Sequence, residues 1–428
     1  MQTRRAPIPH EAFRGPEEQG SAGATPSLRR VISLPWLILY GLGSTVGAGI
    51  YALTGIVAAR AGFQAPLAFA LAALLALCTG LSFAELSARL PRAGGALVYV
   101  RAGLRSSTLS LIVGLLSALS GIVSAATVSQ GFVGYLSELV SIHPGIGLII
   151  VIAGVGGLAA WGMRESVFAA GAITVVEIVG LIAIIGYGTA ALGSQPFDAS
   201  QLIPTELGNT EWVALMSATV LGFFAFLGFE DMVNVAEEVK DVRRNLPKAI
   251  LWTLLISTVL YVAVTSVAVL MVPPHELGES SAPLALVFER SGGSGEVLAF
   301  IAIAAMLNGA LVQIIMASRI LFSLAREGPL PHWIGVVHPK RRTPVRATLI
   351  VTALVATFAA LLPLDELAAT TAAIALSVFT LVNISLFVLR LREGEGPDQF
   401  EPFVPIWVPA LGAIFSFGLF LFEILPSA

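Results

Sequence analysis

Charge is scarce in this sequence. Of its 428 residues 12% are charged, whereas roughly a quarter are charged in a typical soluble domain. Hydrophobic residues make up 56%, gathered in runs of about 20 residues, the length that crosses the hydrocarbon core of a bilayer. This composition excludes an assembly of soluble domains and predicts an integral membrane protein. The single cysteine, Cys78, excludes an intramolecular disulfide.

Motifs for catalysis and nucleotide binding are missing. The five histidines all fall outside the expected spans, and the chain has no H-E-x-x-H, G-x-S-x-G or P-loop pattern. These absences argue against a membrane-embedded enzyme and against an ATP-driven pump that carries its own nucleotide site. No basic patch of the kind that binds nucleic acid is present. We therefore expect no catalytic residue, no metal and no cofactor.

The expected organisation is a short tail followed by a helical bundle. Residues 1–30 are rich in Pro, Gly and charge, which predicts a disordered cytoplasmic tail and not a signal peptide. Residues 31–391 would form a ten-helix core, and residues 392–428 an additional C-terminal membrane helix. The eleven expected spans are 34–59, 64–88, 107–137, 145–162, 166–192, 212–239, 245–272, 296–324, 346–363, 367–391 and 403–425.

The basic residues support this count and give an orientation. If the N-terminus is cytoplasmic, all 24 lysines and arginines except Arg60 and Arg290 fall on the cytoplasmic side. Positive charge in short loops sets the orientation of membrane proteins. We predict a multi-pass protein of the cell inner (plasma) membrane with a cytoplasmic N-terminus and an outer C-terminus. Arginine far outnumbers lysine, which favours a bacterial source.

Two of the expected spans carry helix-breaking sequences at matching positions. The first contains "GLGSTVGAGIY" at 41–51, and the sixth contains "FFAFLGFE" at 223–230. Five spans separate them, which predicts two five-helix repeats of opposite orientation, about 34–192 and 212–391, as in many secondary transporters. Such paired interruptions point to a binding site near the middle of the membrane.

Unwinding a helix in lipid leaves backbone groups unpaired at several kcal/mol each, unless they line a cavity or meet a ligand. The N-H groups at a half-helix N-terminus suit a carboxylate, and free carbonyls suit an ammonium group. A pair of broken helices is therefore typical of a receptor for a zwitterion. Glycine permits both the unusual dihedral angles and the close approach of the backbone.

Other interpretations of these two stretches remain open. "GSTVG" is also a small-xxx-small pattern that can serve close helix packing. The phenylalanines at 223–229 can be lipid-facing bulk. A dinucleotide-binding loop is excluded, because the glycine spacing is wrong and no strand precedes it. The acidic residues directly after the second break favour a binding site.

Four motifs together resemble a known family. They are "GSTVGAGIYALTG" (44–55), "SFAELSARLPRAGGALVYVR" (82–101), "FFAFLGFEDMVNVAEEVKDVRRNLPKAI" (223–250) and "ASRILFSLAREGPLP" (317–331). In this order they resemble the amino acid-polyamine-organocation permeases, particularly the cationic-amino-acid-transporter-like bacterial branch. The resemblance implies an all-α polytopic membrane protein with a LeuT-like 5+5 inverted repeat and discontinuous helices 1 and 6. Such proteins usually have two extra helices and this chain has one, so a monomer and a homodimer both remain open.

The resemblance also assigns roles to residues. The backbone at 45–49 would hold the substrate carboxylate, and carbonyls near Thr45, Phe224 and Leu227 would receive its amino group. Phe226 would close over the substrate from outside. Gln313 would face the pocket, although it can equally be structural filler. The implied substrate-binding residues are Thr45, Val46, Gly47, Ala48, Gly49, Phe224, Phe226, Leu227, Gly228 and Gln313.

Charged residues near the expected inner mouth are candidates for a gate. Glu230 can pair with a cationic side chain, cap the second half of the broken helix or lock the gate. Ion pairs that break on opening are expected among the flanking charges, which can also be ordinary solvated residues. These flanking charges are Glu85, Glu237, Glu238, Arg319 and Arg326.

Glu177 lies 11 residues into the span 166–192. A carboxylate at that depth costs at least ~2.5 kcal/mol, so the side chain should face the bundle. Relatives that couple to protons often carry a lysine at what resembles this position. We predict that Glu177 takes up and releases the coupling proton, with a neutral, hydrogen-bonded packing role as the alternative. Sodium coupling is less favoured, because residues 304–317 contain no hydroxyl pair.

The predicted function is secondary active transport of amino acids across the lipid bilayer of the cell membrane by alternating access, as proton-coupled symport or exchange. The alternatives are an amine or polyamine exchanger of the same fold, a channel, and a substrate sensor that does not transport. The tail is short, and long regulatory tails would favour sensing.

Overall fold

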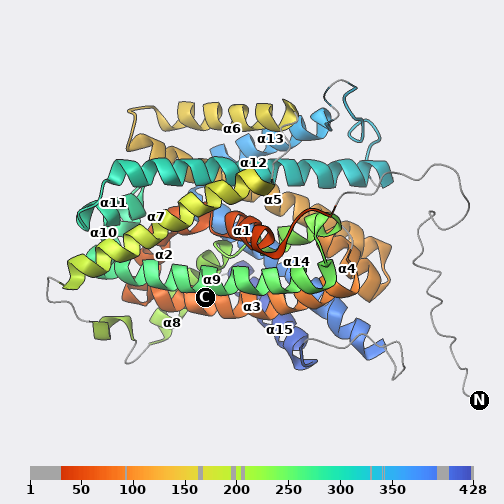
Figure 1. Ribbon diagram of the computed structural model, residues 1–428, viewed down its shortest axis with the longest axis horizontal. Helices are drawn as coiled ribbons and strands as arrows, with labels where there is room; N and C mark the ends of the chain where they lie inside the picture. Colours follow the sequence, from red (N-terminus) through yellow and green to blue (C-terminus); the bar gives the residue numbers. More distant parts are fainter. Residues whose placement is uncertain are drawn as a thin grey trace, which may run out of the picture.

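The computed structural model describes residues 30–91, 94–161, 167–193, 199–203, 208–327, 330–339, 341, 343–392 and 404–425. Over these residues long helices form one bundle, and short helices and turns connect them (Figure 1). Residues 1–29 of the predicted tail and residues 393–403 and 426–428 of the predicted C-terminal segment lie outside the described residues. The chain is an all-α polytopic membrane protein.

All eleven expected spans coincide with helices, whose bounds differ from the expected ones by a few residues. Nine helical stretches in the described part of the chain are long and apolar enough to cross a membrane, with α2 and α3 counted as one stretch and α8 and η5 as another; α13 is a shorter apolar helix outside these nine. The unbroken helices are α3 (Ala65–Arg89), α5 (Ser107–Ser137), α6 (Pro144–Trp161), α7 (Val167–Gly193), α9 (Val242–Met271), α12 (Gly295–Glu327), α13 (Val345–Leu361), α14 (Leu364–Arg392) and α15 (Trp407–Ile424).

Apolar side chains cover the outside of the bundle as well as its core. On α6, Ile149 is 69% exposed and Ile150 is 60% exposed, and on α15 Ile414 is 63% exposed. Large apolar patches are rare on soluble monomers. Lipid tails are as apolar as these side chains, so the exposed surface fits a bilayer.

The helices pack in pairs that have matching places in the two halves of the chain. Helix α3 follows the first broken span and packs against α9, which follows the second. Likewise α5 packs along α12 (Figure 1). Two inverted repeats require this pairing, and the repeat symmetry itself stays a prediction.

A short extended segment ties the start of the bundle to its middle. Ile32 forms a parallel bridge with Val239. The amides of Val31 and Ile32 donate to the Glu238 carbonyl at 2.9 and 3.0 Å, and the Lys240 amide donates to the Ile32 carbonyl at 2.9 Å. Residues just before the first broken span are therefore held at the end of the second.

Helix α3 is joined to α14 by a buried ion cluster. Glu85 is 0% exposed, and its carboxylate binds the guanidinium of Arg89 at 2.6 Å and that of Arg390. Arg392, near the end of α14, donates to the Gly103 carbonyl in α4 (Gly95–Leu104) at 2.8 Å. The sequence predicts Glu85 as a charge beside the inner mouth. In the structure Glu85 belongs to this buried ion cluster, which we call the clamp between α3 and α14.

We expect Glu85→Gln to lower the stability of the protein by about 3 kcal/mol, because removing one partner of a buried ion pair leaves the opposite charges uncompensated. The midpoint of thermal unfolding in detergent measures the loss. The control is Glu276→Gln, which breaks the more exposed Glu276–Arg290 pair (2.8 Å) and should cost at most about 1 kcal/mol. Equal midpoints for the two variants would contradict a stabilising role of the buried cluster.

Candidate functional site

The first expected break is present. Helix α1 (Leu34–Thr45) ends at Thr45, and α2 (Ala48–Ala61) begins at Ala48. Between them Gly47 has φ −46° and ψ −132°, outside the helical region. The last carbonyls of α1 and the first amides of α2 therefore lose their helical hydrogen-bond partners.

The second break is present as well. Helix α8 (Asn209–Phe224) stops at Phe224, and the chain resumes as the 3-10 helix η5 (Phe229–Glu238). Gly228 has φ 119°, a value that L side chains rarely adopt. A Cβ at Gly228 would also collide with the carbonyl oxygen of Ser44 in α1. This position therefore requires glycine for two independent reasons.

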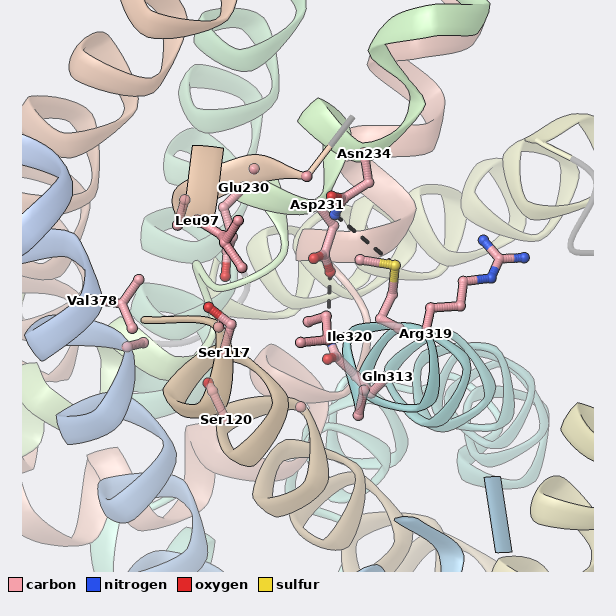
Figure 2. Close-up of a pocket in the computed structure, with 18 of the residues that line it drawn as sticks. Leu97, Ser117, Ser120, Glu230, Asp231, Asn234, Gln313, Arg319, Ile320 and Val378 are labelled. Atoms are coloured by element: carbon pink, nitrogen blue, oxygen red, sulfur yellow. Dashed lines mark hydrogen bonds between the residues drawn. The ribbon is translucent and has the colours of Figure 1, made fainter. Parts of the chain in front are cut away.

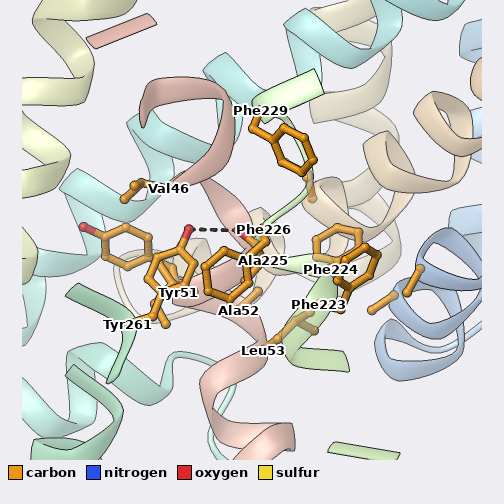
Figure 3. Packing of buried hydrophobic residues seen from close by; sticks show 14 of the residues in the cluster. Val46, Tyr51, Ala52, Leu53, Phe223, Phe224, Ala225, Phe226, Phe229 and Tyr261 are labelled. Carbon is orange, nitrogen blue, oxygen red and sulfur yellow. Dashed lines mark hydrogen bonds between the residues drawn. The ribbon is translucent and has the colours of Figure 1, made fainter. Parts of the chain in front are cut away.

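The two breaks lie side by side. The Ser44 hydroxyl in α1 is 2.9 Å from the Gly228 carbonyl oxygen, to which it donates. A Cβ at Gly49, in the first turn of α2, would be 2.5 Å from the Cα of Ala225. The glycines of both motifs thus allow backbone to approach backbone, and the two interruptions form one continuous buried seam (Figure 3).

Tyr261 of α9 reaches this seam. Its hydroxyl is 2.7 Å from the Thr45 carbonyl oxygen and 2.9 Å from that of Ala225 (Figure 3 shows the bond to Ala225). Its ring packs edge-on against Phe226, with the centroids 4.9 Å apart. Sequence reasoning missed Tyr261. The available signal was a tyrosine inside a span, because tyrosines of membrane proteins gather at the interfaces.

A cavity of about 460 Å³ adjoins the seam (Figure 2). Its walls come from α5, η5, α12, α14 and the start of α4. Of the residues expected to bind substrate, Leu227 and Gln313 line this cavity, and so do the charged Glu230 and Arg319. Glu237 is exposed on η5.

The other expected substrate-binding residues are not part of the cavity lining. Those whose burial the structure describes belong to the seam: Thr45, Val46, Gly47, Gly49, Phe224, Phe226 and Gly228 are buried. Ala48 contributes the first residue of α2. The cavity and the seam meet at Leu227 and Gly228, neighbours in the chain.

Polar side chains line the cavity from η5, α5 and α12, and both of its acidic residues are on η5. Glu230 Oε2 accepts a hydrogen bond from the Gly228 amide at 2.8 Å, so this carboxylate caps the second half-helix, one of its expected roles. Asp231 and Gln313 point toward one another, with Nε2 3.5 Å from Oδ2 (Figure 2). The Asn234 amide lies 4.0 Å from the sulfur of Met316. Glu230 and Asp231 thus place two acidic side chains next to each other on this wall.

The phenylalanines around the second break face the protein interior. Phe223, Phe224, Phe226 and Phe229 are at most 5% exposed. Phe229 packs edge-on against Phe83 of α3, with the centroids 5.7 Å apart. The lipid-facing interpretation of this run was wrong, because the break turns these rings toward α3, α9 and α14. The gating role of Phe226 stays a prediction.

Glu177 of α7 is 0% exposed, as its expected inward orientation requires. Neither carboxylate oxygen has a hydrogen-bond partner among the described residues, whereas the packing alternative needs one. The Tyr51 hydroxyl of α2 donates to the Glu177 backbone carbonyl at 3.0 Å. Glu177 is therefore tied to α2, directly after the first break.

The sequence is similar to that of known membrane transporters over most of its length. The amino acid permease family matches residues 32–428. The branched-chain amino acid permease BcaP of Bacillus subtilis is 30% identical over 92% of this chain and 88% of its own length. The mitochondrial cationic amino acid transporter 3 of Arabidopsis thaliana is 29% identical over 85% of this chain and 63% of its own. The methylthioribose transporter of Bacillus subtilis is 30% identical over 90% and 87%.

Gly228→Ala should destabilise the protein by more than about 1 kcal/mol, because the new Cβ is strained at positive φ and collides with the Ser44 carbonyl. Thermal unfolding in detergent measures the change. Gly154→Ala in α6 is the matched control, since nothing lies within 4 Å of its Cβ position, and it should leave the midpoint unchanged or higher. A Gly228 variant as stable as the wild type would show that the two breaks are not closely packed.

Proposed function

We infer how this chain works from the premise that it belongs to the amino acid permease family and is a membrane transporter of amino acids. It is a secondary active transporter that moves an amino acid by alternating access, with protons as the coupling ion. The observation that carries this proposal is the pair of broken helices lying side by side next to a cavity.

The seam offers the two kinds of group that a zwitterion needs. The start of α2 presents amide N-H groups and the positive end of a helix dipole, which favour a carboxylate. The ends of α1 and α8 present carbonyls, which favour an ammonium group. One substrate backbone that bridges Gly47 and Ala225 would pair groups that the breaks leave without helical partners.

The cavity lies beside the seam, at the end of the bundle that carries the buried arginines of α3 and α14. Positive charge marks the cytoplasmic side of membrane proteins. We therefore propose that the cavity leads to the cytoplasm, so that this conformation faces inward. The route runs from Leu227 past Gln313 toward Arg319.

An amine without a carboxylate is the second candidate for the substrate. The observation that favours it is the adjacent pair Glu230 and Asp231 on the cavity wall, two acidic side chains that could bind a cation. A cationic amino acid would use the same pair with its side chain.

Purified protein in proteoliposomes tests transport directly. Labelled L-leucine, L-arginine, L-alanine, L-glutamate and putrescine are offered under imposed proton or sodium gradients, and with unlabelled substrate inside. Accumulation of an amino acid under an inward proton gradient is the expected result. Absence of uptake and exchange for every compound would overturn the proposed function, and uptake of putrescine alone would favour the amine alternative.

We propose that Glu177 is the residue that carries the coupling proton. Its carboxylate is buried and has no hydrogen-bond partner among the described residues, and its backbone carbonyl accepts a hydrogen bond from Tyr51 of α2 at 3.0 Å. Burial favours the neutral, protonated form of this carboxyl group. Loss or uptake of its proton changes the charge beside the seam by one unit. Movement that changes its access to water would couple proton and substrate flow.

Glu177→Gln should abolish the stimulation of uptake by an inward proton gradient while preserving exchange, because glutamine mimics the protonated, neutral carboxyl. The stimulation ratio, with and without the gradient, is the measurement. The control is Glu289→Gln at an exposed position of α11 (Pro283–Arg290), which should behave like the wild type. Full proton stimulation in the Glu177 variant would exclude this residue as the coupling site.

A further inference from the structure

The ends of two half-helices converge on a single hydroxyl group. Thr45 is the last residue of α1, and Ala225 directly follows α8. The last carbonyls of a helix lack partners and form the negative end of its dipole. The Tyr261 hydroxyl lies within hydrogen-bond distance of both carbonyl oxygens, at 2.7 and 2.9 Å.

All three groups are buried. Thr45 is 2% exposed, Ala225 is 1% and Tyr261 is 0%. Away from water an unpaired carbonyl is costly, so the arrangement needs a donor at this point whenever no substrate supplies one. Tyr261, on a neighbouring unbroken helix, is placed to be that donor.

A tyrosine hydroxyl is an incomplete donor for two carbonyls. It carries one proton, so it serves one oxygen fully or both weakly, whereas an ammonium group carries three. The Thr45 hydroxyl also has no hydrogen-bond partner among the described residues, so a second polar group at this point has hydrogen-bonding capacity left for a ligand. When the seam is empty, the Tyr261 hydroxyl pairs the two carbonyls in part. An ammonium group that enters the seam would pair them more fully.

We propose that the Tyr261 hydroxyl stands in for the ammonium group of the substrate, so that the empty transporter can change conformation. This inference rests on the proposed transport function. A carrier whose carbonyls are paired only by substrate is restricted to exchange, since its empty form cannot return. Tyr261 removes that restriction and makes this chain a carrier of net flux.

The test compares two modes of transport in the same proteoliposomes. Net uptake is measured into liposomes without internal substrate, and exchange into liposomes that contain it, with labelled L-leucine, L-arginine, L-alanine and L-glutamate as probes. For Tyr261→Phe we expect net uptake to fall about tenfold, because a buried carbonyl left unpaired raises the barrier of the step in which the empty carrier returns. Exchange should stay within about twofold of the wild type, because substrate fills the seam in both directions.

Tyr99→Phe is the matched control. Tyr99 is a fully buried tyrosine of α4 whose hydroxyl has no hydrogen-bond partner among the described residues. Its variant removes a hydroxyl from a packed tyrosine without unpairing any carbonyl. Both transport modes should match the wild type.

A second measurement separates the proposed role from a general loss of structure. The unfolding midpoint of Tyr261→Phe should be lower than that of the wild type without substrate, and a saturating probe should raise it by more than in the wild type. A shift of equal size in both proteins would overturn the proposal.

The transport results are equally decisive. Equal loss of net uptake and exchange, or no loss of either, would overturn the role of Tyr261 and leave the transport function standing. Failure of the wild type itself to move any of these probes would overturn the proposed amino acid transport, and this inference with it.

Discussion

Backbone hydrogen bonding in a medium without water is the constraint on which the structure depends. A membrane helix satisfies its own amides and carbonyls, and a break gives up that satisfaction. In this protein the two breaks are placed against each other, where Ser44 meets Gly228 and Gly49 meets Ala225. Neighbouring side chains then take over part of the pairing: Ser44 bonds the second break, Glu230 caps it, and Tyr261 reaches carbonyls from both.

The small residues at the breaks follow from the same constraint. Gly228 adopts a left-handed conformation, and both Gly228 and Gly49 approach backbone of the other broken span without a Cβ between. The alternative of packing glycines and the binding-site interpretation are thus not exclusive. Close approach of the two broken spans brings the free ends of the half-helices together, at the place where we propose that the substrate binds.

The positions of the helices could be predicted from the sequence, because long apolar runs bounded by charge and proline form helices that span the bilayer. The broken spans could also be predicted, since glycine clusters at matching positions mark them. The partners of the breaks could not. Tyr261 is far from both motifs in the chain, and nothing local in its span shows that its hydroxyl meets Thr45. The clamp at Glu85 was missed for the same reason, because Arg390 belongs to a helix about three hundred residues away.

The short parallel bridge between Ile32 and Val239 limits how the bundle can move. Three backbone hydrogen bonds fasten the entrance of α1 to the exit of η5, and the same two elements touch again at Ser44 and Gly228. Because α1 and η5 are attached at two places, no hinge lies between them, and they form one rigid unit. Swinging α1 away by itself would break this bridge, so a motion that preserves it carries the two half-helices together.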